Sequence, residues 1–179
     1  MLDGTKDFSG YWNDASGWPN DETYKGLTVK KKTSQWGGIN KSLTIQTSNS
    51  YTFSTYVKGA GTGTAITRRV SVNGIEDYSL RKTWSTAFDW VRDSVTLTSS
   101  NIKRNDIVSA RYEISVLGTN QALWNAGHKW EPGSTATPYM PSASEVTVED
   151  YPSYIGTYTD SDSNTQSTDP EKYVWKKID

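Results

Sequence analysis

The sequence predicts an all-β protein, an antiparallel jelly-roll β-sandwich followed by a short extended linker and a small C-terminal β module. Apolar and polar residues alternate with a period of two through most of the chain, which is the pattern of half-buried strands. The alternating runs are short and are separated by turns rich in Gly, Asn and Ser, as in sandwiches and jelly rolls. No stretch has a convincing helical periodicity, which argues against a helical domain.

The first half of the predicted sandwich lies between residues 24 and 59. A strand over residues 24–32 ends in three lysines and the turn "TSQWGG", and a second apolar run follows over residues 39–45. "YTFSTYVKG", residues 51–59, alternates more regularly. Its apolar face is expected to point into the core and carries Tyr51, Phe53 and Val57. Its other face carries Thr52, Ser54, Tyr56 and Lys58.

The second half contains four further strands. "AITRRVSVNG" places Ile66, Val70 and Val72 on one face with Arg68. In "WVRDSVTLT" the residues expected to point inward are Val91, Asp93, Val95 and Leu97, and those expected outward are Trp90, Arg92 and Thr96. "DIVSARYEISVLG" turns Val108, Ala110, Tyr112, Ile114 and Val116 inward and Ser109, Arg111, Glu113 and Ser115 outward. "ALWNAGHKWEPG" closes the set, with Trp124 expected in the core.

The chain divides into three predicted segments. Residues 1–132 form the sandwich, because Pro132 and Gly133 end the last alternating run. Residues 133–148, rich in Ser, Thr, Ala and Pro, are predicted to be an extended linker. Residues 149–179 carry two aromatic clusters around a polar acidic loop, which predicts a hairpin-like module that is too small to be stable alone.

Composition excludes several classes of protein. The 179 residues include no cysteine, which rules out disulfides, thiol catalysis and cysteine-ligated zinc. Nineteen basic and twenty acidic residues give a net charge of −1, so we expect neither nucleic acid nor membrane as a partner. The sequence shows no secretory signal and no apolar run near transmembrane length. Its eight Trp and eleven Tyr, against three Phe, favour partly wet surfaces as well as a β core.

No catalytic constellation can be assembled from the sequence. His128 is the only histidine and lies in a predicted strand between Trp124 and Trp130, so we expect a structural imidazole. A glycosidase would need two facing carboxylates. Glu113 and Asp93, expected on neighbouring strands, are the candidates, although Arg111 is expected to pair with Glu113. "DSDSN", residues 160–164, resembles a calcium loop but lacks the glycine and the closing glutamate of an EF-hand. We therefore expect a non-enzyme.

The predicted binding site consists of aromatic residues in turns and polar residues on strand faces. Trp18 in "SGWPND", Trp36 in "SQWGG" and Trp84 in "KTWST" have little core to cover them. Flat sugar faces stack on such rings, and sugar hydroxyls need fixed polar partners. The alternative is that each Trp folds back over the sandwich edge, which Pro19 favours for Trp18. The predicted carbohydrate-binding residues are Trp36, Trp84, Trp18, Tyr56, Arg68, Arg111 and Glu113, with Lys58 as a further polar candidate.

Three stretches resemble a known family. "WEPGSTATPYMPSASEV" is similar to the segment that closes carbohydrate-binding-module-like domains in tail and baseplate proteins of siphophages of Gram-positive bacteria, lactococcal phages among them. "YPSYIGTYTDSDSNTQSTDPEKYVWKKI" resembles the small module that follows such domains. "GTKDFSGYW" and "YKGLTVKKKTSQWGGINKSLTIQTSNSYTFSTYVKG" resemble the N-terminal half of the same sandwich. The resemblance spans essentially the whole chain.

The resemblance implies a carbohydrate-binding jelly roll on a phage virion that acts at the bacterial surface. Its implied partners are host cell-wall saccharide and other tail or baseplate proteins. No cofactor is implied, apart from the structural calcium ion that many related modules hold. The family's domain usually follows an anchoring segment, whereas Met1 here falls almost on the first expected strand. This start indicates either a fragment or a protein that docks through its C-terminal module. The alternative function is a structural protein that braces the tail without touching sugar.

Overall fold

The computed structural model describes residues 2–147, 149–150, 154–159 and 167–178. Two compact units divide the chain, the first comprising Met1–Ala136 and the second Thr137–Asp179. The first unit is a two-layer antiparallel β-sandwich, and the described part of the second contains one pair of short strands. The predicted all-β fold class is therefore confirmed. Within the described residues, no helix has the length and apolar character needed to span a membrane.

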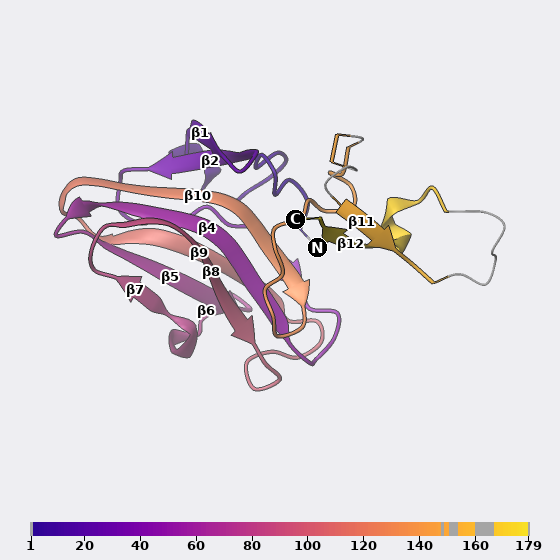
Figure 1. Cartoon of the computed structure of the whole chain (residues 1–179). Coiled ribbons are helices and arrows are strands. Elements are labelled where there is room, and N and C mark those ends of the chain that lie inside the picture. The colour runs from indigo at the N-terminus through magenta and orange to yellow at the C-terminus, as the bar shows by residue number, and fades with distance from the viewer. Residues whose placement is uncertain (1, 148, 151–153, 160–166, 179) are drawn as a thin grey trace. The chain divides into compact units, whose positions relative to one another are not determined.

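One layer of the sandwich is a five-stranded sheet in the order β1-β2-β10-β4-β8 (Figure 1). Its neighbouring strands pair antiparallel throughout, and β1 and β8 form its two edges. We call this layer the first sheet. Its strands are β1 (Asn20–Tyr24), β2 (Leu27–Lys32), β4 (Tyr51–Thr62), β8 (Phe88–Leu97) and β10 (Thr119–Pro132).

The second sheet has the order β3-β9-β5-β6, and a short strand, β7, also pairs with β5. Its strands are β3 (Leu43–Thr44), β5 (Ala65–Val72), β6 (Ile75–Glu76), β7 (Lys82–Trp84) and β9 (Ile107–Val116). Two single-turn 3-10 helices, η1 (Ala15–Gly17) and η2 (Tyr78–Leu80), lie in the connections. The strands alternate as the sequence predicts, so each sheet has an apolar inner face and a mostly polar outer face.

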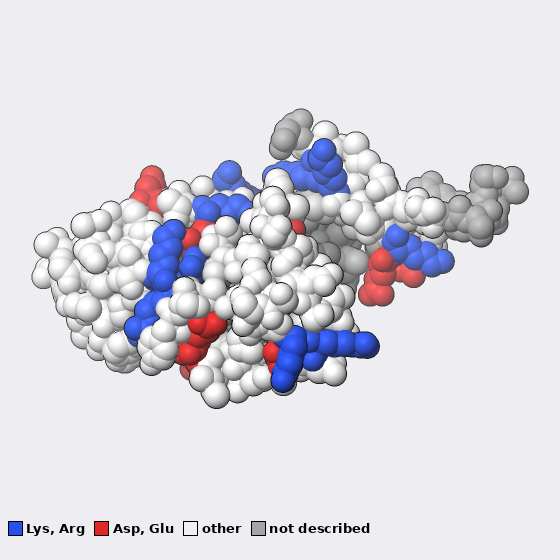
Figure 2. All heavy atoms as spheres, turned by 90° about the horizontal axis from the view of Figure 1, so that it is seen from below, with Lys and Arg blue, Asp and Glu red and all other residues white. Residues whose placement is uncertain are grey.

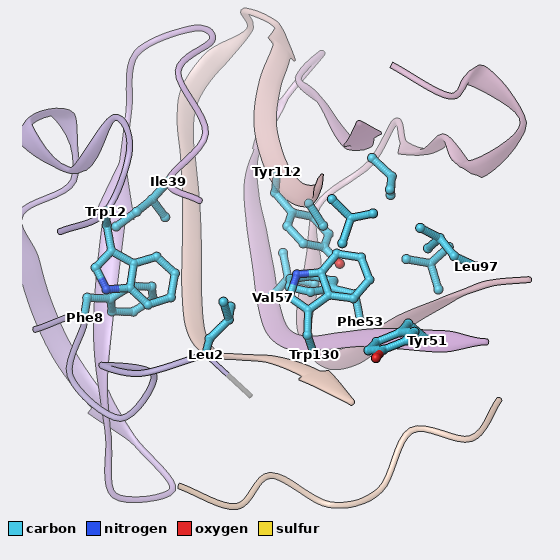
Figure 3. Packing of buried hydrophobic residues seen from close by; sticks show 14 of the residues in the cluster. Leu2, Phe8, Trp12, Ile39, Tyr51, Phe53, Val57, Leu97, Tyr112 and Trp130 are labelled. Atoms are coloured by element: carbon cyan, nitrogen blue, oxygen red, sulfur yellow. The ribbon is translucent and has the colours of Figure 1, made fainter. Parts of the chain in front are cut away.

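The core lies between the two sheets and extends under the N-terminal segment. Phe53 of β4 packs against Trp130 of β10, with ring centroids 5.2 Å apart, and faces Tyr112 of β9 (Figure 3). Phe8 and Trp12 form an edge-to-face pair at 4.9 Å beside Ile39. Residues before β1 are thus part of the core, because Phe8 and Trp12 belong to the same buried cluster as the strand residues.

A β-bulge in β10 explains the main error in the predicted core. The pairing of β10 with β4 shifts between Ala126 and Lys129, and Gly127 supplies the positive φ, +65°, in this bulge. One extra residue reverses the alternation. Trp130 therefore points inward and is 1% exposed, whereas Trp124 lies on the outer face. The expectation that Trp124 is a core residue was therefore wrong.

Three other positions differ from the predicted pattern. Trp84 was expected in a turn but is the last residue of β7, where it pairs with the inward-facing Ile66 of β5. Opposite residues of an antiparallel pair share a face, so the indole lies on the core side, stacked on Phe88 at 5.1 Å. Val91 and Val116 were expected inside but are exposed. They lie near the start of β8 and at the end of β9.

A charged cluster joins the two sheets through the interior. Asp93 of β8 accepts hydrogen bonds from Arg68 of β5 at 2.7 Å, from Tyr112 of β9 at 2.6 Å and from Lys82 of β7 at 2.8 Å. Burial is the main reason that the pKa of Tyr112 rises well above its usual value, and the Asp93 charge adds to it. Because Asp93 is 4% exposed, its carboxylate depends on these three donors.

The second unit contains the antiparallel pair of β11 (Tyr154–Thr157) and β12 (Val174–Lys177), with a 3-10 turn, η4 (Pro170–Lys172), just before β12. Tyr173 contacts Tyr158 and Trp175, with ring centroids 4.6 and 5.3 Å apart. This pair agrees with the hairpin-like module that the sequence predicts. The calcium-like stretch at 160–164 lies outside the described residues.

Candidate functional site

Four aromatic side chains gather on the outer face of the first sheet rather than in the core. They are half-buried and come from four different parts of the chain. Tyr56 lies on β4, Trp90 on β8 and Trp124 on β10, and Tyr24 is the last residue of β1. We call these four residues the aromatic face. Their alternation with inward residues such as Val57 and Leu123 explains their orientation.

Strand register places cationic side chains between these rings. Trp124 pairs with Lys31 of β2 on one side and with Lys58 of β4 on the other. The two ammonium groups lie 5.1 and 4.7 Å from the centroid of the Trp124 ring. The indole Nε1 of Trp124 donates to Asp21 at 2.7 Å. Both ends of this indole are therefore oriented, the ring by cations and the N–H by a carboxylate.

A ring contact joins the two opposite edges of the first sheet. Tyr24 of β1 stacks on Trp90 of β8, with centroids 4.3 Å apart and an interplanar angle of 15°. Tyr24 also meets Tyr56 edge-on at 5.3 Å. The turn at Lys25 and Gly26, both with positive φ, lets the β1–β2 hairpin bring Tyr24 over the outer face. The three rings thus form one continuous apolar surface with polar groups around it.

A second group, which we call the Trp36 patch, lies on the outer face of the second sheet. Arg69 of β5 pairs with Glu113 of β9 and with Glu76 of β6, both at 2.8 Å, and Arg111 pairs with Glu113 at 2.8 Å. The Arg69 guanidinium lies 5.4 Å from the Trp36 ring centroid. Figure 2, which views the molecule from the side of β6 and β7, shows basic and acidic side chains next to one another on this face.

The backbone around Trp36 is held by several contacts. Its N–H donates to the Ile114 carbonyl of β9 at 3.1 Å. The carbonyl of Gly37 accepts from Trp18 Nε1 at 2.8 Å and from Lys32 Nζ at 3.0 Å. Trp36 has φ +59°, a conformation that costs energy for a residue with a Cβ. The ring is nevertheless 47% exposed, so its position is fixed without its being part of the core.

The structure distributes the seven predicted site residues over three places. Tyr56 lies on the aromatic face. Trp36, Arg111 and Glu113 come together in the Trp36 patch. The other three point into the sandwich and do not reach either surface group: Trp84 stacks on Phe88, Arg68 pairs with Asp93, and Trp18, 1% exposed, donates to Gly37. Lys58, the further polar candidate, lies between Trp90 and Trp124.

The aromatic face was missed as a group, although part of its signal was readable. The period of two correctly turned Trp90, Tyr56 and Lys58 outward. The sequence-based prediction favours aromatic residues in turns over these strand positions, so it does not group the four residues. Trp124 could not be assigned correctly without the bulge, and Gly127 in "WNAGHKW" was the signal for it. The contact of Tyr24 with Trp90 joins the two edge strands of the first sheet, and no local sequence pattern predicts such a contact.

The groups considered for catalysis do not form a catalytic pair. Asp93 and Glu113 were expected on neighbouring strands, but β8 and β9 belong to different sheets. Asp93 lies in the interior, and Glu113 lies on the opposite side of the second sheet and is bonded to Arg69 and Arg111. The described residues contain no group of three or more His, Asp or Glu that could hold a metal ion.

His128 is part of the core packing. Its imidazole touches the rings of Phe8, Trp12 and Phe53. Nδ1 lies 3.0 Å from the Thr55 hydroxyl and Nε2 lies 3.3 Å from the Ile39 carbonyl. Burial lowers the pKa of His128 to about 4, against a smaller opposite effect of the Ile39 carbonyl. The imidazole is therefore neutral near pH 7, which agrees with the structural role expected from the sequence.

Comparison with known proteins relates this fold to carbohydrate-binding modules. No protein-family model and no curated protein matches the chain. A solved structure of TmCBM61 in complex with β-1,4-galactotriose matches at a TM-score of 0.50 and 11% identity, covering 73% of this chain and 96% of that one. The CBM22-1 xylan-binding domain of Xyn10C from Paenibacillus barcinonensis matches at 0.47 and 17%, covering 66% and 81%.

A phage structure is also among the matches. The tripod (BppUct-A-L) from the baseplate of bacteriophage Tuc2009 matches at a TM-score of 0.39 and 25% identity, covering 85% of this chain and 63% of that one. Taken together with the antiparallel sheets described above, the match to TmCBM61 assigns the first unit to a fold. The chain contains a β-sandwich of the carbohydrate-binding-module type.

Proposed function

We propose that this protein is a non-catalytic saccharide-binding protein and that the aromatic face is its binding site. The observation that carries the proposal is the position of Trp90 and Trp124. Two indoles that alternation places outside the core, flanked by Lys58 and Asp21, are poorly explained by stability alone. Flat C–H faces of sugar rings stack on such indoles, and the adjacent polar groups can bind hydroxyls.

The Trp36 patch is a second contact point in this proposal. It retains Trp36, Arg111 and Glu113 from the sequence prediction, as the aromatic face retains Tyr56. Trp18, Trp84 and Arg68 are left out because their side chains face the interior. For each surface we expect a dissociation constant of about 0.1–1 mM, with avidity supplied by several copies acting together.

The proposed setting is the tail or baseplate of a bacteriophage, in the role of an accessory upper-baseplate protein that assists attachment to host cell-wall polysaccharide. Its support is the sequence resemblance of "WEPGSTATPYMPSASEV" and of the C-terminal module to siphophage tail proteins. The partners in this setting are the wall saccharide and neighbouring baseplate proteins. The alternative, a bracing protein that binds no sugar, predicts that the indoles of the aromatic face have no ligand.

The test measures glycan binding and thermal unfolding for the same variants. Trp124→Ala should weaken binding to purified host wall polysaccharide about tenfold, equivalent to about 1.4 kcal/mol. Its melting temperature should fall much less than that of Trp130→Ala, because Trp124 lies outside the core. Trp130→Ala is the matched control, since the same change in the core should cost about 3–5 kcal/mol of stability. Isothermal titration and calorimetric melting provide the two readouts.

Three outcomes would contradict the proposal. Unchanged binding in both Trp124→Ala and Trp90→Ala would exclude the aromatic face as the site. Absence of binding to any wall glycan by the unmodified protein would favour the bracing role. Release of reducing ends from the polysaccharide during these incubations would show that the protein is an enzyme.

A further inference from the structure

The aromatic face carries more cationic than anionic side chains. Four cations lie within 6 Å of its ring centroids. Arg92 lies 5.1 Å from Tyr56, Lys25 lies 5.6 Å from Tyr56, and Lys31 and Lys58 lie 5.1 and 4.7 Å from Trp124. The chain as a whole has a net charge of −1. The basic character of this surface is therefore local.

The carboxylates beside these cations form only weak ion pairs with them. Asp21 lies 3.8 Å from Lys31, and its other oxygen accepts the Trp124 N–H. Glu22 lies 4.0 Å from Lys58. Exposed pairs at such distances contribute about 0–1 kcal/mol. The ammonium groups of Lys31 and Lys58 are therefore held only weakly by these carboxylates and can donate to an incoming anion.

Lys58 has the most central position among these cations. Its ammonium group lies 4.7 Å from the Trp124 centroid and 5.8 Å from the Trp90 centroid, so it stands between the two indoles. Its side chain is 31% exposed. A sugar ring stacked on either indole would place a substituent of that ring close to this ammonium group. A carboxylate or phosphate there would form a charge-assisted hydrogen bond, which is stronger than the bond a hydroxyl forms.

We propose that the aromatic face selects acidic saccharides, which carry uronate carboxylates or phosphodiesters, over neutral ones, with Lys58 as the central contact to the anionic group. The proposal rests on the saccharide-binding function above and adds the class of ligand. Stacking on Trp90 and Trp124 supplies the affinity common to all saccharides. The ammonium groups of Lys31 and Lys58 supply the preference for negative charge.

The experiment compares three glycan probes and two lysine variants of the full chain. Oligogalacturonate presents carboxylates, glycerol-phosphate teichoic acid presents phosphodiesters, and β-1,4-galacto-oligosaccharide is neutral. Lys58→Gln should weaken binding of the acidic probe about fivefold, the upper range for one exposed charge pair, and should weaken binding of the neutral probe much less, because the glutamine amide can still bond a sugar hydroxyl. Lys103→Gln, an exposed lysine in the 98–106 connection away from these rings, is the control and should change neither.

The salt dependence gives an independent readout. Binding of the acidic probes should weaken as ionic strength rises, because exposed charges are screened beyond about 10 Å at 0.1 M salt. Binding of the neutral probe should not. Tighter binding of oligogalacturonate would show that the anionic group is a uronate carboxylate, and tighter binding of teichoic acid would show that it is a phosphodiester.

The outcomes separate this proposal from the function on which it rests. Equal affinity for neutral and acidic probes, with no effect of Lys58→Gln, would overturn the charge preference and leave saccharide binding intact. Binding of none of the three probes would overturn both. Binding of oligothymidylate as tight as that of the acidic glycans would overturn the selection for saccharides, since stacking rings and cations also suit single-stranded nucleic acid.

Discussion

Burial of the His128 side chain explains why this residue has a structural role. The imidazole lies among Phe8, Trp12 and Phe53 and has a pKa of about 4. A histidine with this pKa stays neutral near pH 7. Because the folded-state pKa lies below the unfolded value of 6.5, the unfolded chain binds the proton first as the pH falls. Its contribution to stability is complete above pH 6.5 and is lost between about pH 6.5 and 4.

Acid should therefore destabilise the sandwich before its carboxylates titrate. Between pH 6.5 and 4 the protein should lose about 3 kcal/mol of unfolding free energy, at about 1.36 kcal/mol per pKa unit. His128→Gln should be less stable at pH 7 but should have a flatter profile from pH 6.5 to 5. Urea unfolding at a series of pH values measures both. A variant with the same slope as the parent protein would assign the acid sensitivity to other groups.

Carboxylates contribute at lower pH. Glu76 is partly buried, which by itself raises its pKa, but hydrogen bonds from Arg81 and Arg69 outweigh burial and lower it. A carboxyl with a lowered pKa stabilises the fold above its unfolded value of 4.5 and loses that contribution as the pH falls further. Protonation of His128 and protonation of Glu76 thus destabilise the protein in adjacent pH ranges. His128 acts in the higher of the two ranges.

At the scale of single elements, the segment that carries Trp36 stores strain. Trp36 has φ +59° and Gly37 has φ +63°, and the segment is held against β9 by the bond to Ile114. At Gly38 a Cβ would lie 2.4 Å from the Tyr112 carbonyl. The segment can follow β9 this closely only because that position lacks a side chain. Trp36, which lies beside this contact, therefore has a left-handed backbone conformation that a glycine would adopt at a lower energetic cost.

Two substitutions at Trp36 separate the strain from the loss of the ring. Trp36→Gly and Trp36→Ala remove the same contact with Arg69, but only alanine keeps a Cβ at positive φ. Trp36→Gly should be the more stable of the two by about 1 kcal/mol, the cost of the left-handed region. Both should weaken glycan binding equally if the Trp36 patch is a contact point. Thermal melting and titration of both variants test this, and a more stable alanine variant would contradict it.

The strands show which parts of the structure could be predicted from the sequence. β4 and β9 follow a strict period of two, so their facing residues were assigned correctly from Tyr51 to Val57 and from Val108 to Ile114. β10 contains a bulge, and its single inserted residue places Trp124 and Trp130 on opposite faces, whereas strict alternation would place them on the same face. Trp84 was misassigned because β7 is too short to show a period. The aromatic face depends on contacts between β1 and β8, and sequence alternation contains no information about such distant pairs.

At the scale of the whole chain, the two compact units predict a specific pattern of proteolysis. β10 ends at Pro132, and only isolated turns follow over residues 133–147. Limited proteolysis within the mostly exposed residues 134–138 should therefore release a sandwich that melts like the same domain in the full chain. Mass spectrometry of the fragments and calorimetry of the product check this. A first cut inside β4 or β9 would show that the sandwich does not fold as one unit.

The stack of Tyr24 on Trp90 also bears on the rate of ligand binding. One face of the Trp90 indole is already covered by a ring from the opposite edge of the sheet, at 4.3 Å, a spacing that leaves no room for a sugar between them. A saccharide that uses this side of Trp90 must wait until the β1–β2 hairpin moves away. Association would then level off at a maximum set by the hairpin and not by ligand concentration, whereas association at Trp124 would keep rising with concentration.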